Sequence, residues 1–141
     1  MILLVALLAC SGGRATPPKT TGAEEPTELV SAKGLYHLRW RAAGPVVMGE
    51  LFSVETTLLD AQGQPVEQGS VQVDARMPQH GHGMTTRPVA DPGNCTAGIC
   101  RHPNGIYRMD GMKFHMQGEW TLTFAVDGPA GPDKAEARYA L

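Results

Sequence analysis

The chain has 141 residues, of which 42% are hydrophobic and 18% are charged, and its formal net charge is −2. This length and composition predict one folded domain and exclude wholesale disorder. The near balance of 12 basic and 14 acidic residues gives no electrostatic footprint for nucleic acid, so we expect no nucleic-acid partner. The 17 glycines and 11 prolines indicate many turns and short strands.

The N-terminus has the character of an export signal. Residues 1–9 read MILLVALLA, an apolar run that is too short to cross a bilayer as a helix but suits a secretory signal. The run Leu-Leu-Ala-Cys, which ends at Cys10, resembles a bacterial lipobox, in which cleavage precedes a cysteine that is then lipidated. A plain signal peptide with an incidental cysteine is the alternative. We expect a lipidated Cys10, and Ser11 after it favours the outer membrane, facing the periplasm.

Residues 10–33 contain little that a folded domain would bury. Serine, glycine, proline, threonine and charged residues dominate this segment, which predicts a flexible tether between the lipid and the domain. We therefore expect a signal segment at 1–9, a lipid-anchored tether at 10–33 and a folded domain at 34–141. The lipid is the only membrane attachment that this arrangement predicts.

Beyond residue 34, hydrophobic and polar residues alternate with a period of two. The alternation is clear at 36–41, 52–58, 71–77 and 120–126, and further strands are expected at 107–114 and 135–141. Together with Gly/Pro turns, this pattern predicts an all-β, immunoglobulin-like β-sandwich of about 6–8 short strands. The residues expected in its core are Leu38, Trp40, Phe52, Val54, Val71, Val73, Trp120, Leu122 and Phe124.

Two segments at strand ends concentrate the residues with metal-binding chemistry. Residues 77–84 read MPQHGHGM and residues 109–116 read MDGMKFHM, and together they hold five of the seven methionines and three of the five histidines. Imidazole suits copper in either oxidation state and also zinc, whereas thioether sulfur selects Cu(I). This composition predicts a copper site, for Cu(I) or Cu(II), with no covalent cofactor.

The expected ligands are His80, His82 and Met84, with His115 as the fourth from a neighbouring strand end. Single glycines separate the first three residues, so the backbone is free to fold them around one ion. By strand parity, His115 faces away from the Phe114 side. The alternative for His80 and His82 is a solvated, glycine-rich turn.

Other methionines in these segments have a simpler role. Met77 continues the apolar row of its strand, and Met112 and Met116 share strand parity with Phe114. We therefore expect these three methionines to fill the core rather than to bind metal.

Cys95 and Cys100 lie in a long segment, 85–104, that we expect to be a loop and that also contains His102. With Cys10 lipidated, these two cysteines remain as a pair, and in an exported protein nearby thiols normally form a disulfide. Such a bridge would tie down the loop. A thiolate copper site is the alternative.

The ordered motifs resemble those of a known family. MPQHGHGM at 77–84, then Gly-Ile-Tyr at 105–107, then MKFHMxGxWxL at 112–122 resemble the YtkA-like domain and the related FixH-type proteins over about residues 34–128. The resemblance implies a small exported immunoglobulin-like sandwich, similar in outline to periplasmic copper carriers and associated with copper handling or respiratory oxidase assembly. The cysteine pair departs from the family pattern.

We expect the protein not to be an enzyme. The sequence has no Gly-x-Ser-x-Gly nucleophile motif, phosphate loop or dinucleotide fingerprint. A copper monooxygenase with an N-terminal histidine brace is excluded, because the processed N-terminus would be Cys10. The sequence instead predicts an envelope lipoprotein that binds copper and buffers it or passes it on, with an envelope copper protein or oxidase assembly factor as partner. The alternative is a structural or protein-interaction domain of the envelope that binds no metal.

Overall fold

The structure is a computed structural model, and it describes residues 26–141. The predicted signal segment, the predicted lipidation site at Cys10 and the tether as far as residue 25 lie outside the described residues. Within the described part, no helix is long and apolar enough to cross a membrane.

Strands are the main secondary structure of residues 26–141, which contain no α-helix and one short 3-10 turn at Pro103–Gly105. The strands are β1 Thr27–Val30, β2 Tyr36–Ala42, β3 Leu51–Asp60, β4 Ser70–Met77, β5 His82–Gly83, β6 Val89–Ala90, β7 Asn94–Thr96, β8 Ile99–Arg101, β9 Ile106–Lys113, β10 Glu119–Gly128 and β11 Gly131–Ala140.

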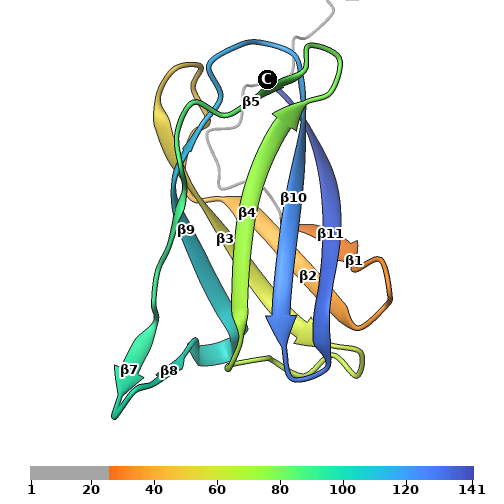
Figure 1. The fold of residues 1–141 in the computed structure, drawn as a ribbon, viewed down its shortest axis with the longest axis vertical. Helices are drawn as coiled ribbons and strands as arrows, with labels where there is room; N and C mark the ends of the chain where they lie inside the picture. Colours follow the sequence, from red (N-terminus) through yellow and green to blue (C-terminus); the bar gives the residue numbers. More distant parts are fainter. Residues whose placement is uncertain (1–25) are drawn as a thin grey trace, which may run out of the picture.

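Two antiparallel sheets face each other (Figure 1). One has the strand order β1-β2-β3-β9-β6 and the other has the order β11-β10-β4-β5, while β7 and β8 pair in a small sheet of their own. This architecture confirms the predicted all-β sandwich. The predicted main strands all form, and the additional ones are short: β1, β5 and β6 lie at sheet edges, and β7 and β8 form the small separate sheet.

The core lies between the two sheets because each long strand buries every second side chain. In β4 the burial alternates along all eight residues, and in β2 along all seven. Every residue that we expected in the core is buried there. Aromatic contacts join the sheets, for example between Trp40 and Phe124, whose ring centroids lie 5.7 Å apart. At one end of the core, the Phe114 ring stacks on the Trp120 ring at 4.7 Å.

The folded part begins earlier than the sequence predicted. Strand β1 lies inside the segment that we assigned to the tether, and it pairs with β2, so a tether reaching residue 33 is wrong. Beyond β1, the buried Ser31 hydroxyl accepts a hydrogen bond from the Tyr36 backbone N–H. Asp133 of β11 accepts hydrogen bonds from the backbone N–H groups of Lys33 and Leu35. Residues 27–33 therefore join the domain mainly through backbone hydrogen bonds, and Leu29 adds a partly buried contact with the core.

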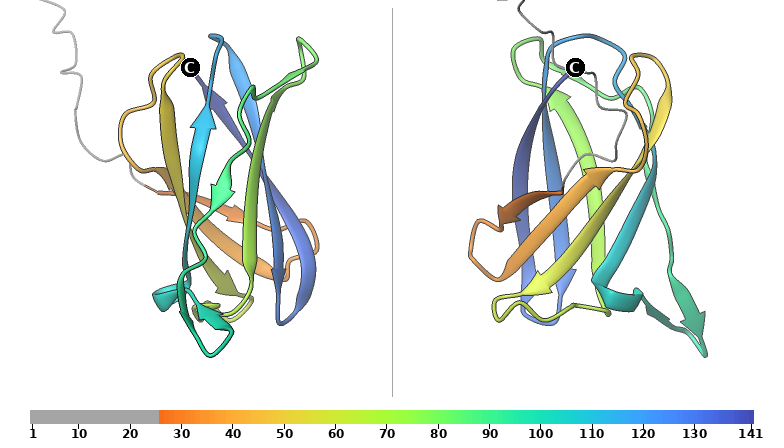
Figure 2. Two further views of the ribbon diagram at one scale, coloured as in Figure 1. Left: turned by 60° about the vertical axis from the view of Figure 1, so that its left-hand side comes forward. Right: turned by 180° about the vertical axis from the view of Figure 1, so that it is seen from behind.

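Residues 85–104 are also more ordered than the predicted loop. Strand β6 pairs with β9, and β7 and β8 form a hairpin that extends away from the sandwich (Figure 2). His102 is buried and stacks on Tyr107 with ring centroids 4.0 Å apart, and its backbone N–H donates to the Glu67 carbonyl. Burial raises the pKa of Tyr107 to about 12.

The connections β2–β3, β4–β5 and β9–β10 gather at one end of the sandwich, whereas the β7–β8 hairpin lies at the opposite end (Figures 1 and 2). Two backbone hydrogen bonds between Gly118 and Leu141 hold the chain's C-terminus beside the β9–β10 connection. A third backbone bond, from Gly49 N–H to the Phe114 carbonyl, joins the β2–β3 connection to the same end. This end therefore brings together both methionine- and histidine-rich segments.

Candidate metal centre

The turn from β4 to β5 presents two of the predicted ligands. After β4 ends at Met77, the chain reverses and Met77 pairs with His82. The His80 backbone N–H donates to the Met77 carbonyl at 3.1 Å, and Gly81 adopts the left-handed region with φ of 65°. Glycine adopts this conformation readily, so the turn places His80 and His82 close together, both exposed.

The three predicted histidines come together at this end of the sandwich. The ring centroid of His82 lies 6.4 Å from that of His80, with the two planes 16° apart. It also lies 6.4 Å from that of His115, which comes from the β9–β10 connection. His82 is therefore the central imidazole of the three.

His115 has a more constrained environment than the other two. Its side chain is half-buried, and its ring meets the Trp120 ring edge-to-face at 5.4 Å. Trp120 is itself fixed, because its Nε1 donates to the Met116 carbonyl at 3.1 Å. Among the described residues, Nδ1 of His115 is buried and has no hydrogen-bond partner. A buried polar atom without a partner is unfavourable, and a bound metal ion would satisfy this nitrogen.

The methionines divide as the sequence analysis expected, with one difference. Met77 and Met112 are fully buried in the core. Met116 is only partly buried against it, as is Met84, whose backbone N–H donates to the Ala75 carbonyl. Both thioethers are therefore only partly buried at the edge of the core, whereas strand parity alone had assigned Met116 to its interior.

The spacing of the imidazoles tests whether they fit one ion. Two imidazoles that bind one ion with metal–nitrogen distances of about 2.0–2.1 Å have ring centroids about 5–5.5 Å apart in tetrahedral or trigonal geometry, and about 6.4 Å apart only when the two nitrogens lie on opposite sides of the ion. Both measured separations of 6.4 Å exceed the tetrahedral spacing. Across residues 26–141, no group of three or more His, Cys, Asp or Glu side chains is arranged to hold a metal ion. The three imidazoles therefore lie near one another but are too far apart to bind one ion together. Binding of one ion by all three imidazoles would require the exposed β4–β5 turn to move inward.

Trp120 and Gly118 are the supporting residues that the sequence analysis did not assign to this site. The Trp120 ring packs edge-to-face against the His115 ring and supports it from the core side. At Gly118, an added Cβ would lie 2.7 Å from Cε of Met77, so the β9–β10 connection passes directly over that side chain. The Gly-x-Trp spacing next to His115 is the one sequence feature that pointed to these two residues. The contacts that explain the spacing are visible only in the structure.

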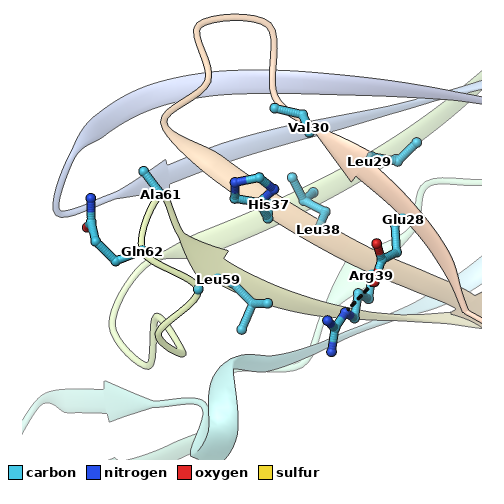
Figure 3. A pocket seen from close by; sticks show the side chains of 10 residues that line it. Glu28, Leu29, Val30, His37, Leu38, Arg39, Leu59, Ala61 and Gln62 are labelled. Carbon is cyan, nitrogen blue, oxygen red and sulfur yellow. Dashed lines mark hydrogen bonds and ion pairs between the residues drawn. The ribbon is translucent and has the colours of Figure 1, made fainter.

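A separate hollow of about 380 Å³ lies beside β1 and β2 (Figure 3). Its lining contains the ion pair of Arg39 with Glu28, at 2.9 Å, between two solvent-exposed side chains. His37 and Leu59 also line it. No nucleophile is paired with a general base among the described residues that line this hollow.

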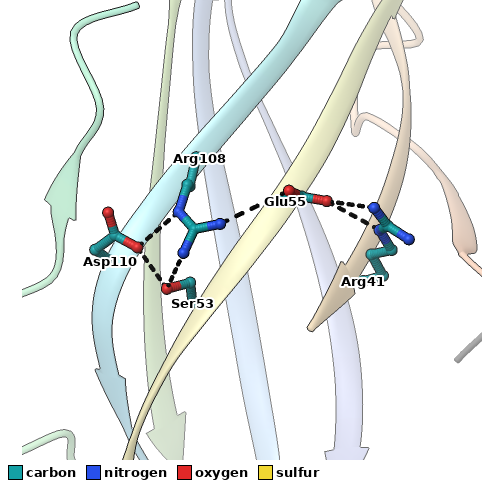
Figure 4. A network of polar contacts seen from close by, with 5 residues as sticks. All are labelled: Arg41, Ser53, Glu55, Arg108 and Asp110. Atoms are coloured by element: carbon teal, nitrogen blue, oxygen red, sulfur yellow. Dashed lines mark hydrogen bonds and ion pairs between the residues drawn. The ribbon is translucent and has the colours of Figure 1, made fainter. Parts of the chain in front are cut away.

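A polar network crosses the outer face of β2, β3 and β9 (Figure 4). Glu55 binds Arg41 at 2.6 Å and Arg108 at 3.7 Å, and Arg108 binds Asp110 at 2.9 Å. The hydrogen bond from the Ser53 hydroxyl, followed by the bond from Arg108, lowers the pKa of Asp110. Two arginine side chains thus balance two carboxylates on this exposed face. The network joins the three strands and leaves no charged patch for a ligand.

Comparison with known families agrees with this architecture. A family model described as YtkA-like matches residues 43–125, which include β3, β4, β9 and both segments of the histidine end. The chain belongs to the YtkA-like family. This YtkA-like domain extends beyond the matched region on both sides, through β1 and β2 and through β11. No curated protein and no solved structure matches the chain significantly.

Proposed function

We propose that this YtkA-like protein binds one copper ion at the histidine end of its sandwich and buffers it or passes it on. The ligands are His80, His82 and His115 with the thioether of Met84. The observation that carries the proposal is the central place of His82, whose ring lies 6.4 Å from each of the other two.

The chemistry of the donors favours copper over other metals. Imidazole binds both Cu(I) and Cu(II), while a thioether selects the softer Cu(I) ion. Carboxylates, which Ca²⁺ and Mg²⁺ prefer, are absent from the turn at residues 78–84. The unpartnered Nδ1 of His115 provides a donor on a ring that neighbours His82.

The exposure of the ligands favours transfer rather than permanent storage. His80 and His82 are exposed, so an ion bound there remains accessible to ligands from another protein. In the proposed setting, a lipid on Cys10 holds the protein in the bacterial envelope, and an envelope copper protein or an oxidase assembly factor receives the ion. The protein performs no catalysis in this proposal.

The test is competition with a Cu(I) chelator, using wild type and the single variants His80→Ala, His82→Ala, Met84→Ala and His115→Ala. We expect the largest loss of affinity for His82→Ala, because His82 is the imidazole adjacent to both others. His37→Ala is the matched control, since His37 is an exposed histidine on β2. If the double variant of His80 and His82 retains wild-type affinity, the copper proposal is wrong and an envelope interaction domain becomes the better interpretation.

A further inference from the structure

The β7–β8 hairpin carries a disulfide that the proposed copper function does not use. Cys95 and Cys100 are directly opposite each other in the two strands, and their sulfurs are bonded at 2.02 Å. Both cysteines are exposed, and the hairpin extends from the end of the sandwich opposite to the histidines (Figures 1 and 2).

The hairpin has the geometry of a stable turn without the bridge. Its two central residues, Ala97 and Gly98, have φ of 50° and 79°. Positive φ at both positions is the property of the type I′ turn, whose twist matches that of paired strands. Backbone pairing on either side, from Asn94 with Arg101 to Thr96 with Ile99, completes the hairpin.

The bridge therefore contributes little to the rest of the fold. It joins residues only five apart in the chain, and β7 and β8 form a sheet of their own. No residue of the hairpin belongs to the buried core of the described chain. A disulfide that serves stability normally links distant segments or is buried beside the core, and this one does neither.

We propose that Cys95 and Cys100 form a redox-active pair that exchanges electrons with a protein dithiol of the thioredoxin type. Thiol–disulfide exchange requires a thiolate to reach one sulfur along the S–S axis, so exposure of the bridge is the main structural requirement. The projecting hairpin meets that requirement without any unfolding of the sandwich.

The surroundings of the Cys95 sulfur assign the direction of attack. Sγ of Cys95 lies 3.5 Å from the Pro92 carbonyl oxygen and 3.9 Å from that of Gly93. These oxygens disfavour negative charge on Cys95, so Cys100 is the better leaving group. The partner's thiolate bonds to Cys95 while the Cys95–Cys100 bond breaks and its electron pair passes to Cys100, which takes a proton from water.

The partner's second thiol completes the reaction. It loses its proton to water and attacks the partner sulfur of the mixed disulfide, and Cys95 leaves with the electron pair and takes up a proton. The hairpin thereby gains two electrons and two protons, and the partner dithiol becomes a disulfide. The reverse sequence would oxidise the hairpin again.

The experiment follows reduction of the oxidised full chain by reduced thioredoxin under native conditions, with alkylation and mass spectrometry to count free thiols. The reference is an oxidised peptide of residues 94–101. We expect the protein to react within about tenfold of the peptide rate, because both cysteines are exposed on a hairpin that projects from the sandwich. A rate more than about a hundredfold slower would show that the bridge is a protected structural disulfide and would overturn the proposal.

A second measurement tests the assigned direction. Thioredoxin whose resolving cysteine is changed to serine should trap a mixed disulfide on Cys95, identified by peptide mass. The variants Cys95→Ser and Cys100→Ser, oxidised with a small disulfide reagent, serve as references for each linkage. Trapping on Cys100 would overturn the assigned order of attack.

Discussion

The His115 ring lies edge-to-face against the Trp120 ring, with their centroids 5.4 Å apart. Trp120 is fully buried and stacks on Phe114, so the surface imidazole is positioned directly by the core. This contact explains how a residue in a connection between strands is held in place. Because Trp120 also binds the Met116 carbonyl, one side chain fixes both the imidazole and the backbone that follows it.

Replacing Trp120 with alanine should destabilise the domain by about 3–5 kcal/mol, because the substitution leaves a cavity at a fully buried aromatic site. Chemical denaturation measures the loss. The control is Gln72→Ala, at an exposed position of the neighbouring strand β4, which should change the free energy of unfolding by less than about 0.5 kcal/mol. A loss below about 1 kcal/mol for Trp120→Ala would contradict the described packing.

Gly118→Ala should disturb the histidine end through a contact with Met77. The added Cβ would lie 2.7 Å from Cε of Met77, at a φ of 133° that side chains rarely adopt. Gly44→Ala is the matched control, because its φ is 115° but nothing lies within 4 Å of the added carbon. We expect Gly118→Ala to be the more destabilising by about 1 kcal/mol, since the flexible methionine end relieves part of the clash. Equal losses would show that the Met77 contact is unimportant.

Asp133 should make stability depend on pH. Burial opposes its ionisation, but hydrogen bonds from Ser31 and from the backbone N–H groups of Lys134, Lys33 and Leu35 outweigh burial and lower the pKa. A lowered folded-state pKa stabilises the domain above the unfolded value of about 3.9, and this stability is lost as pH falls through the folded value.

Asp133→Asn should therefore lower the melting temperature at pH 7, with the difference from wild type shrinking as the pH falls below about 4. Melting curves from pH 2 to pH 7 measure the effect. The control is Asp127→Asn, at an exposed aspartate on the β10–β11 hairpin. A difference that stays constant over this pH range would rule out the ionised carboxylate as the cause.

Removing the bridge with Cys95→Ser and Cys100→Ser together should leave the sandwich folded. Closing so short a ring stabilises a protein by about 2 kcal/mol in the chain-entropy account. We therefore expect the melting temperature to fall by less than about 10 °C. Loss of cooperative unfolding would instead show that the hairpin supports the core.

The main strands followed from local patterns, whereas the histidine end required contacts between distant residues. Alternation identified rows such as Trp120, Leu122 and Phe124, because a half-buried strand has a period of two. Strand β1 was missed because it is four residues long and mostly exposed, so its burial has no readable period. Its position depends on backbone pairing with β2 and on Asp133, far away in the sequence.

The approach of His115 to His82 illustrates the same limit within the site. Strand parity predicted that His115 would face away from the core, but its neighbour depends on which connections meet at one end of the sandwich. The partial burial of Met116 likewise depends on the path of the connection after Phe114, where strand parity no longer applies.

The most direct test of the copper site is an NMR titration of the histidine ring nitrogens with Cu(I), with the protein labelled with nitrogen-15. One ion shared by the three imidazoles should shift the ring signals of His80, His82 and His115 together, with saturation at one equivalent. The rings of His37, on the exposed face of β2, and of His102, stacked on Tyr107, should remain unchanged. Saturation without any shift of the His82 ring would contradict the proposed copper site.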